Sequence, residues 1–162
     1  MHSRCDVRRS IALILLTVGT AHFDPLIRKV DSLVRSGVIK ETVVAQIGGG
    51  SYEPDSFRYF RFIRSMEEAF QRADVIVSTG GAGTTLECVT KGRRLVVVEN
   101  TLLMEGHQAQ LIGEMERRGH LVWCRDLDRL PECISKARNL EFVPFVSDPP
   151  VAHNLILQLL TN

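Results

Sequence analysis

The chain has 162 residues and a formal net charge of +1, with 44% hydrophobic and 24% charged residues. This length fits a single domain that can bury a core, and the composition is that of an ordinary globular protein. The near-neutral charge gives no support for nucleic acid as a partner. No apolar run approaches the roughly 20 residues of a membrane span.

Apolar runs that predict strands alternate with amphipathic stretches that predict helices along most of the chain. Strands are expected at 11–18, 42–47, 57–63, 75–78, 95–99 and 121–124. Helices are expected at 23–35, 66–72, 105–118, 127–138 and 151–160, with one more after residue 80, and Gly119 is a predicted C-cap. Six such alternations predict an α/β fold, a Rossmann-like doubly wound and mainly parallel sheet.

The domain organisation is predicted to be simple, because no repeat, low-complexity segment or long linker interrupts the chain. We expect an N-terminal extension over residues 1–10 and one domain over residues 11–162. Ligands of doubly wound sheets bind beyond the carboxyl ends of the strands. The turns near Gly19, 63–64, Gly80 and 100–107 should therefore open on one edge.

The most informative stretch is DVIVSTGGAGTTLE, residues 74–87. It is predicted to be a strand, a glycine turn and the start of a helix, an arrangement that presents free backbone N–H groups and the positive helix end to an anion. Glycines allow the backbone to approach that anion closely. Glu87 is placed to accept hydrogen bonds from ribose hydroxyls, although an ordinary surface carboxylate is the alternative. The segment predicts a nucleotide diphosphate site.

Two common nucleotide motifs do not fit. The first turn, Gly19-Thr20-Ala21-His22, lacks the G-x-G-x-x-G pattern of dinucleotide-binding proteins, and the chain contains no P-loop motif. The four cysteines show no metal-ligand spacing and suit a reducing cytosol. We therefore expect no metal and no cofactor.

An ordered set of motifs covers most of residues 13–124. They are LLTVGT (15–20), FDPLI (23–27), QIGGG (46–50), ADVIVSTGGAGTTLE (73–87), KGRRLVVVEN (91–100), LMEGHQAQL (103–111) and GHLVWC (119–124). With these motifs the chain resembles the C-terminal, donor-binding half of glycosyltransferase family 28, half of a GT-B fold. More closely it resembles the small soluble subunits of two-part sugar transferases, those that extend dolichol-linked oligosaccharides and those of bacterial exopolysaccharide systems.

The resemblance implies a role for each matching residue. The donor diphosphate would lie against Gly19, Thr20, Gly81, Ala82, Gly83 and Thr84. The ribose would bind Glu87, the sugar or a phosphate would contact His107 and Gln108, and the uracil would lie against Phe62 and Ile63.

Two histidines, His107 and His22, also have a second interpretation. His107 could merely cap its helix, although Gln108 beside it favours the site. His22 lies in the first-turn loop, where it could reach a phosphate, act as a weak candidate for the catalytic base or simply be exposed. His120 and Trp123 are expected to be packing residues.

The resemblance implies transfer of a sugar from a UDP-sugar to a lipid-linked acceptor, with inversion at the anomeric carbon. N-acetylglucosamine is the first choice of sugar, and glucose or glucuronic acid remains open. The catalytic base commonly comes from the acceptor domain, which the resemblance does not cover. We therefore expect a membrane-anchored acceptor-domain subunit as partner, and a cytoplasmic location at the cytosolic membrane face through that partner. The alternative is a non-catalytic nucleotide-sugar-binding or regulatory module on the same fold.

Overall fold

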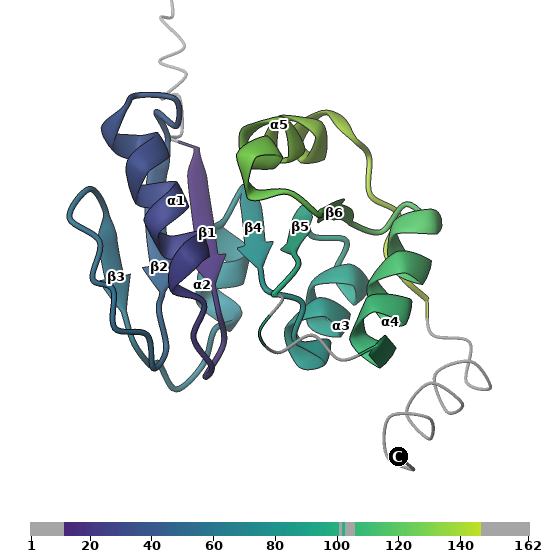
Figure 1. The fold of residues 1–162 in the computed structure, drawn as a ribbon. Helices are drawn as coiled ribbons and strands as arrows, with labels where there is room; N and C mark the ends of the chain where they lie inside the picture. Colours follow the sequence, from purple (N-terminus) through teal and green to yellow (C-terminus); the bar gives the residue numbers. More distant parts are fainter. Residues whose placement is uncertain (1–11, 101, 103–105, 147–162) are drawn as a thin grey trace, which may run out of the picture.

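The computed structural model describes residues 12–100, 102 and 106–146, and within them six parallel strands form one sheet (Figure 1). The strand order is β3-β2-β1-β4-β5-β6, so the chain starts in the middle of the sheet, builds outward to one edge and then crosses to build the other. This is the doubly wound order with its switch point between β1 and β4. The predicted Rossmann-like fold class is confirmed.

The strands are short and alternate with helices, except that β3 follows β2 without a helix between them. Strands β1 to β6 comprise Leu13–Thr17, Thr42–Gln46, Arg58–Phe60, Val75–Ser78, Leu95–Val98 and Val122–Cys124. Helices α1 to α5 comprise Asp24–Arg35, Glu67–Arg72, Ala82–Thr90, Gly106–Arg117 and Leu130–Asn139, and a 3-10 turn, η1, comprises Leu127–Arg129.

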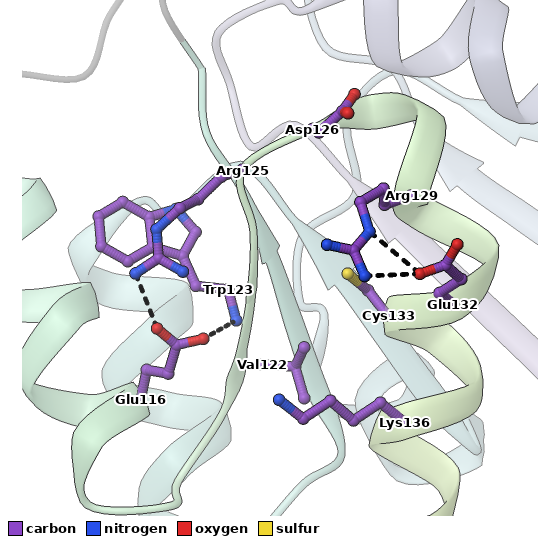
Figure 2. Close-up of a pocket in the computed structure, with 9 residues that line it drawn as sticks. All are labelled: Glu116, Val122, Trp123, Arg125, Asp126, Arg129, Glu132, Cys133 and Lys136. Carbon is purple, nitrogen blue, oxygen red and sulfur yellow. Dashed lines mark hydrogen bonds and ion pairs between the residues drawn. The ribbon is translucent and has the colours of Figure 1, made fainter.

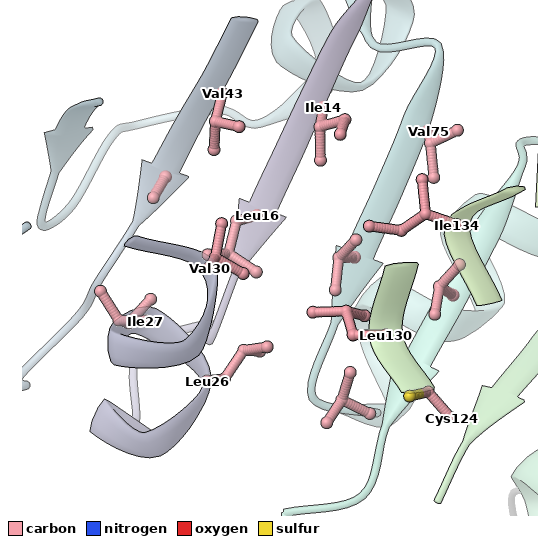
Figure 3. Packing of buried hydrophobic residues seen from close by; sticks show 14 of the residues in the cluster. Ile14, Leu16, Leu26, Ile27, Val30, Val43, Val75, Cys124, Leu130 and Ile134 are labelled. Carbon is pink, nitrogen blue, oxygen red and sulfur yellow. The ribbon is translucent and has the colours of Figure 1, made fainter. Parts of the chain in front are cut away.

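Two hydrophobic cores lie on the two faces of the sheet. On one face, Ile14 and Leu16 of β1 join Val75 of β4 against α1 and α5 (Figure 3). On the other, Leu15 of β1 points between α2, α3 and α4. Because successive side chains of a strand point to opposite faces, a strand covered on both sides must be apolar throughout. This explains the uninterrupted apolar runs of β1, β4 and β5.

Two elements differ clearly from those expected from the sequence. Strand β3 pairs with β2 only over Arg58–Phe60, because Arg61 turns inward and donates to the carbonyls of Gly48 and Gly50 at 3.1 and 2.7 Å. The expected helix at 127–138 starts as the η1 turn, and α5 begins at Leu130 with Pro131 in its first turn.

The ends of the chain fall mostly outside the described residues, including the expected extension at 1–10 and the expected helix at 151–160. The last described segment returns across α3, where Phe145 N donates to Val89 O at 2.8 Å. The Nδ1 atom of His120 lies 2.7 Å from Val143 O and its ring meets Phe145 edge-on, which confirms His120 as a packing residue. In the described part of the chain, every helix is too short or too polar to cross a bilayer.

Candidate functional site

Three neighbouring strands end in the same kind of turn, in which a polar side chain accepts a backbone N–H two residues further on. After β1, Thr17 Oγ1 accepts from Gly19 N at 3.1 Å, and after β4, Ser78 Oγ accepts from Gly80 N at 3.2 Å. Both glycines have positive φ, +68° and +79°, which is why glycine is required there. After β5, the side chain of Asn100 accepts from Leu102 N at 3.0 Å.

The second of these turns leads directly into α3. Its N-cap residue, Gly81, has no side-chain hydrogen bond to the helix, and the first N–H bonded within this turn is that of Thr85, to Gly81 O at 2.9 Å. The N–H groups of Ala82, Gly83 and Thr84 are thus the free donors of a helix start. Together with the positive end of the helix dipole, they form a place for an anion.

A cavity of about 360 Å³ lies between these turns. It is lined by Val18, Gly19, Thr20, Ala21, Thr79, Gly81, Ala82, Gly83, Thr84, Asn100 and Gln108. The structure therefore brings together seven of the residues proposed from the sequence, from segments far apart in the chain. All of the described lining side chains are uncharged, so an anion here would be held by N–H groups, hydroxyls and amides.

Glu87 does not line this cavity but lies one helical turn beyond Gly83 on the same face of α3. Its Oε1 atom accepts a hydrogen bond from Lys91 Nζ at 3.1 Å, and the same ammonium group lies 3.5 Å from Glu67 of α2. The hydrogen bond to Glu87 raises the pKa of Lys91, so the lysine is charged at neutral pH. Since the Glu87 side chain is 39% exposed, its carboxylate is accessible to a ligand.

Phe62 and Ile63 follow β3 and are 62% and 52% exposed. Ile63 lines a separate cavity of about 330 Å³ between β1, β2 and α2, together with Leu15 and Ala69. The structure thus places Ile63 beside α2 and leaves Phe62 exposed. The role of Phe62 and Ile63 in binding uracil stays a prediction.

The two histidines proposed from the sequence lie differently. His22 is exposed in the turn after β1 and is not among the residues that line the cavity. His107 is in the first turn of α4, and its side chain lies outside the described part of the structure. Gln108, its neighbour, is half-buried and lines the cavity.

Four residues of the cavity were not proposed as site residues from the sequence, namely Val18, Ala21, Thr79 and Asn100. Thr79 lies within the glycine-rich turn and could have been included with it. Asn100 had one signal, its position directly after the β5 run LVVVE, where a polar residue ends a buried parallel strand. Its 3% exposed fraction could not be known in advance.

A larger cavity of about 470 Å³ lies at the free edge of the sheet, between α4, β6 and α5 (Figure 2). Arg125 stacks on Trp123 at 3.9 Å from the ring centroid and pairs with Glu116 at 2.8 Å, while Arg129 pairs with Glu132. These charged groups already neutralise each other, and the cavity is formed by one local stretch of chain. We therefore take the smaller, strand-end cavity as the functional site. Among the described residues, no cluster of His, Cys, Asp or Glu could hold a metal ion.

An all-parallel, doubly wound sheet with glycine turns and a helix start at its carboxyl edge defines a Rossmann-like domain with an anion-binding edge. The matching family is the glycosyltransferase family 28 C-terminal domain, which aligns with residues 13–142. The chain belongs to this family, and the resemblance seen in its motifs is confirmed.

Named relatives agree with this assignment. The UDP-N-acetylglucosamine transferase subunit ALG13 of Homo sapiens is 35% identical over 142 residues, which cover 81% of this chain but only 12% of the human protein. The match to an NMR structure of ALG13 covers 93% of this chain and 97% of the ALG13 chain, with 18% identity and a TM-score of 0.58. The match to the crystal structure of MurG from Acinetobacter baumannii covers 91% of this chain and 49% of the MurG chain, with 19% identity and a TM-score of 0.58. The two structures support the fold.

Proposed function

We propose that this chain is the donor-binding subunit of a two-part inverting glycosyltransferase, which moves a sugar from a UDP-sugar to a lipid-linked acceptor. N-acetylglucosamine is the first candidate, because the human relative is named as a subunit of a UDP-N-acetylglucosamine transferase. The observation that carries the proposal is the uncharged cavity at the start of α3, which joins residues of three strand ends.

The diphosphate would lie against the free N–H groups of Gly83 and Thr84. An ideal Cβ built on Gly83 meets no atom within 4 Å, so the residue is not needed as glycine for packing. Its lack of a side chain keeps open the space in front of the helix start. This agrees with the close approach of a ligand to the backbone.

The nucleoside would extend from the diphosphate along α3 toward Glu87. One carboxylate oxygen of Glu87 is engaged by Lys91, and the other is available to a ribose hydroxyl. Phe62 and Ile63, exposed on the same side of the molecule as α2, are the apolar residues on which the uracil would rest. Gln108, at the other side of the cavity, would contact the sugar or a phosphate, and His107 would act beside it.

The reaction also needs a base that deprotonates the acceptor hydroxyl. Among the described residues that line the cavity there is no Asp, Glu or His. We therefore propose that the base comes from a membrane-anchored acceptor-domain subunit, with His22 as the weaker candidate in this chain. Such a partner would hold the protein at the cytosolic membrane face. The same observation favours the second candidate function, a nucleotide-sugar-binding or regulatory module without catalysis.

Calorimetric titration of UDP-N-acetylglucosamine, UDP-glucose and NAD into the full chain tests the donor site. Replacement Glu87→Gln should weaken binding of the UDP-sugar by about tenfold, the usual effect of losing a hydrogen bond to a charged group. Glu132→Gln is the matched control. Like Glu87, Glu132 is an exposed helical carboxylate in an ion pair with a basic side chain, here Arg129, but it lies in α5. NAD binding, or no binding of any UDP-sugar, would contradict the proposal.

The catalytic proposal requires a second measurement. The isolated chain should bind the donor but transfer no sugar to a lipid acceptor, and transfer should appear when the acceptor-domain subunit is added. Transfer by the isolated chain would place the base within it, and His22→Ala would then be the first variant to assay. Binding without transfer under either condition would favour the regulatory module.

A further inference from the structure

Asn100 lies two residues after β5, the third of the three strands whose turns frame the strand-end cavity. Its side chain is nearly inaccessible, with 3% of the residue exposed, yet it lines the cavity together with Thr84 and Gln108. A buried polar side chain at a cavity wall needs partners for all of its polar atoms. Which of its atoms already have partners decides what it offers to a ligand.

The amide oxygen of Asn100 is committed to the turn, because it accepts from Leu102 N at 3.0 Å. This bond orients the carboxamide and leaves the Nδ2 group, with two N–H donors, for another acceptor. Among the described residues, the hydrogen bonds of the protein include none donated by Asn100 Nδ2. At this wall of the cavity, the Nδ2 group of Asn100 is therefore a donor held in a fixed orientation.

The Nδ2 group donates and cannot accept, so it suits a ligand group that only accepts, such as a phosphate oxygen. The described lining residues include no cation, so the negative charge of a diphosphate must be met by oriented N–H groups. The free N–H groups of α3 provide one such set. The Asn100 amide provides a second set from the neighbouring strand.

The two ends of the ligand can be placed from the sheet order. Glu87 lies on the side of α2, because Lys91 contacts both Glu87 and Glu67 of α2. Asn100 follows β5, which lies on the other side of β4 from β1 and α2. A nucleotide with its ribose at Glu87 thus has its outer phosphate nearest Asn100. Resting on the function proposed above, we infer that Asn100 Nδ2 donates to the β-phosphate of the donor and distinguishes a diphosphate from a monophosphate.

The test compares binding of UMP and UDP by calorimetry in the wild-type chain and in two variants. Asn100→Ser is neutral and retains an oxygen that can accept from Leu102 N, as Thr17 and Ser78 do in the neighbouring turns. Asn100→Asp has the same shape and retains the acceptor, but replaces both donors by a negative charge. Asn139→Asp is the control, an exposed asparagine whose Nδ2 donates within α5, far from the cavity.

In wild-type protein UDP should bind more tightly than UMP, and Asn100→Ser should reduce this ratio by about tenfold, as expected for a hydrogen bond to a charged group. Asn100→Asp should reduce it further, with little change in the affinity for UMP. An unchanged ratio in both variants, or an equal loss of UMP and UDP, would overturn the inference. If the wild-type chain binds neither nucleotide nor UDP-sugar, the proposed function itself fails, which is a distinct result. Should Asn100→Asp not fold, the ratio in Asn100→Ser decides.

Discussion

Thr17 and Gln46 are joined across β1 and β2 by a buried hydrogen bond of 2.7 Å, donated by Thr17 Oγ1 to Gln46 Oε1. The same hydroxyl oxygen accepts from Gly19 N. One side chain thus ties together two strand ends and the first turn of the candidate site. The shape of that turn depends on a group that lies beneath the cavity.

Replacement Thr17→Val should destabilise the protein by about 1–3 kcal/mol, because it keeps the shape but leaves Gln46 Oε1 and Gly19 N without their partner. Thr17→Ser keeps the hydroxyl and is the control. Urea unfolding followed by circular dichroism measures both variants. Equal stability of the two would show that the hydroxyl contributes nothing.

Gly48 lies under the first turn, with φ of +54°. A Cβ at this position would lie 2.1 Å from Ala21 O and 2.8 Å from Gly19 O. Gly48→Ala should therefore displace this turn and cost at least about 2 kcal/mol in free energy of unfolding, from backbone strain and overlap. It should also weaken UDP binding, although Gly48 is not among the lining residues.

The neighbouring Gly49→Ala is the control, because a Cβ there meets nothing within 4 Å and the residue is exposed. Its stability should stay within about 0.5–1 kcal/mol of the wild type. Thermal unfolding and nucleotide titration of the pair check the prediction. Wild-type behaviour of Gly48→Ala would contradict it.

Asp31 of α1 is buried and accepts hydrogen bonds from Tyr52 Oη at 2.5 Å and from Ser56 N at 2.9 Å. Burial raises the pKa of Asp31, but these hydrogen bonds and the charge of Arg35 outweigh burial, so the net pKa lies below 3.8. A carboxylate with a lowered pKa contributes stability above its unfolded pKa and loses it as the pH falls through the folded value.

Tyr52→Phe should therefore destabilise the protein more at pH 7 than at pH 3, where Asp31 becomes protonated in the unfolded chain. Guanidinium unfolding at the two pH values measures the difference. In an Asp31→Asn background the same replacement should lose this pH dependence. An equal effect of Tyr52→Phe at both pH values would refute the role assigned to Asp31.

The described cysteines should differ in reactivity toward iodoacetamide. Burial raises the pKa of the Cys88 and Cys124 thiols to about 12, so at pH 8 they carry almost no thiolate, the reactive form. Cys133 is only half-buried and lines the cavity at the sheet edge. Peptide mass mapping of native protein should find Cys133 labelled first, and all three labelled in denaturant. Rapid native labelling of Cys88 would contradict this expectation.

Much of the fold could be predicted from the sequence because its signals are local. The run at 95–98 is apolar at every position and the run at 75–78 is apolar up to Ser78, and both are buried throughout, as in strands covered on both faces. Gly119 was a predicted C-cap, and its φ of +77°, with His120 N bonded to Met115 O, confirms it. Strand β3 was overestimated because its end depends on Arg61 and the distant Gly48 carbonyl, a contact that no local pattern shows.

The candidate site was predictable where it depends on backbone and only partly elsewhere. The glycine turn and helix start at Gly81 to Thr84 have a recognisable pattern, and they do line the cavity. The hydrogen bond from Leu102 N to the Asn100 side chain was not predicted, because many polar residues that follow a strand could form such a turn. The ion pair of Glu87 with Lys91 follows the i,i+4 rule and could have been predicted with the helix.

The cavity at the edge of the sheet has a consequence for how copies of the protein meet. Trp123 N points away from β5 and donates to Glu116 Oε1 at 3.1 Å, while Arg125 covers the indole ring. A strand arriving from another molecule would have to displace both side chains before it could extend the sheet. The open side of β6 is thereby protected from the edge-to-edge pairing that leads to aggregation.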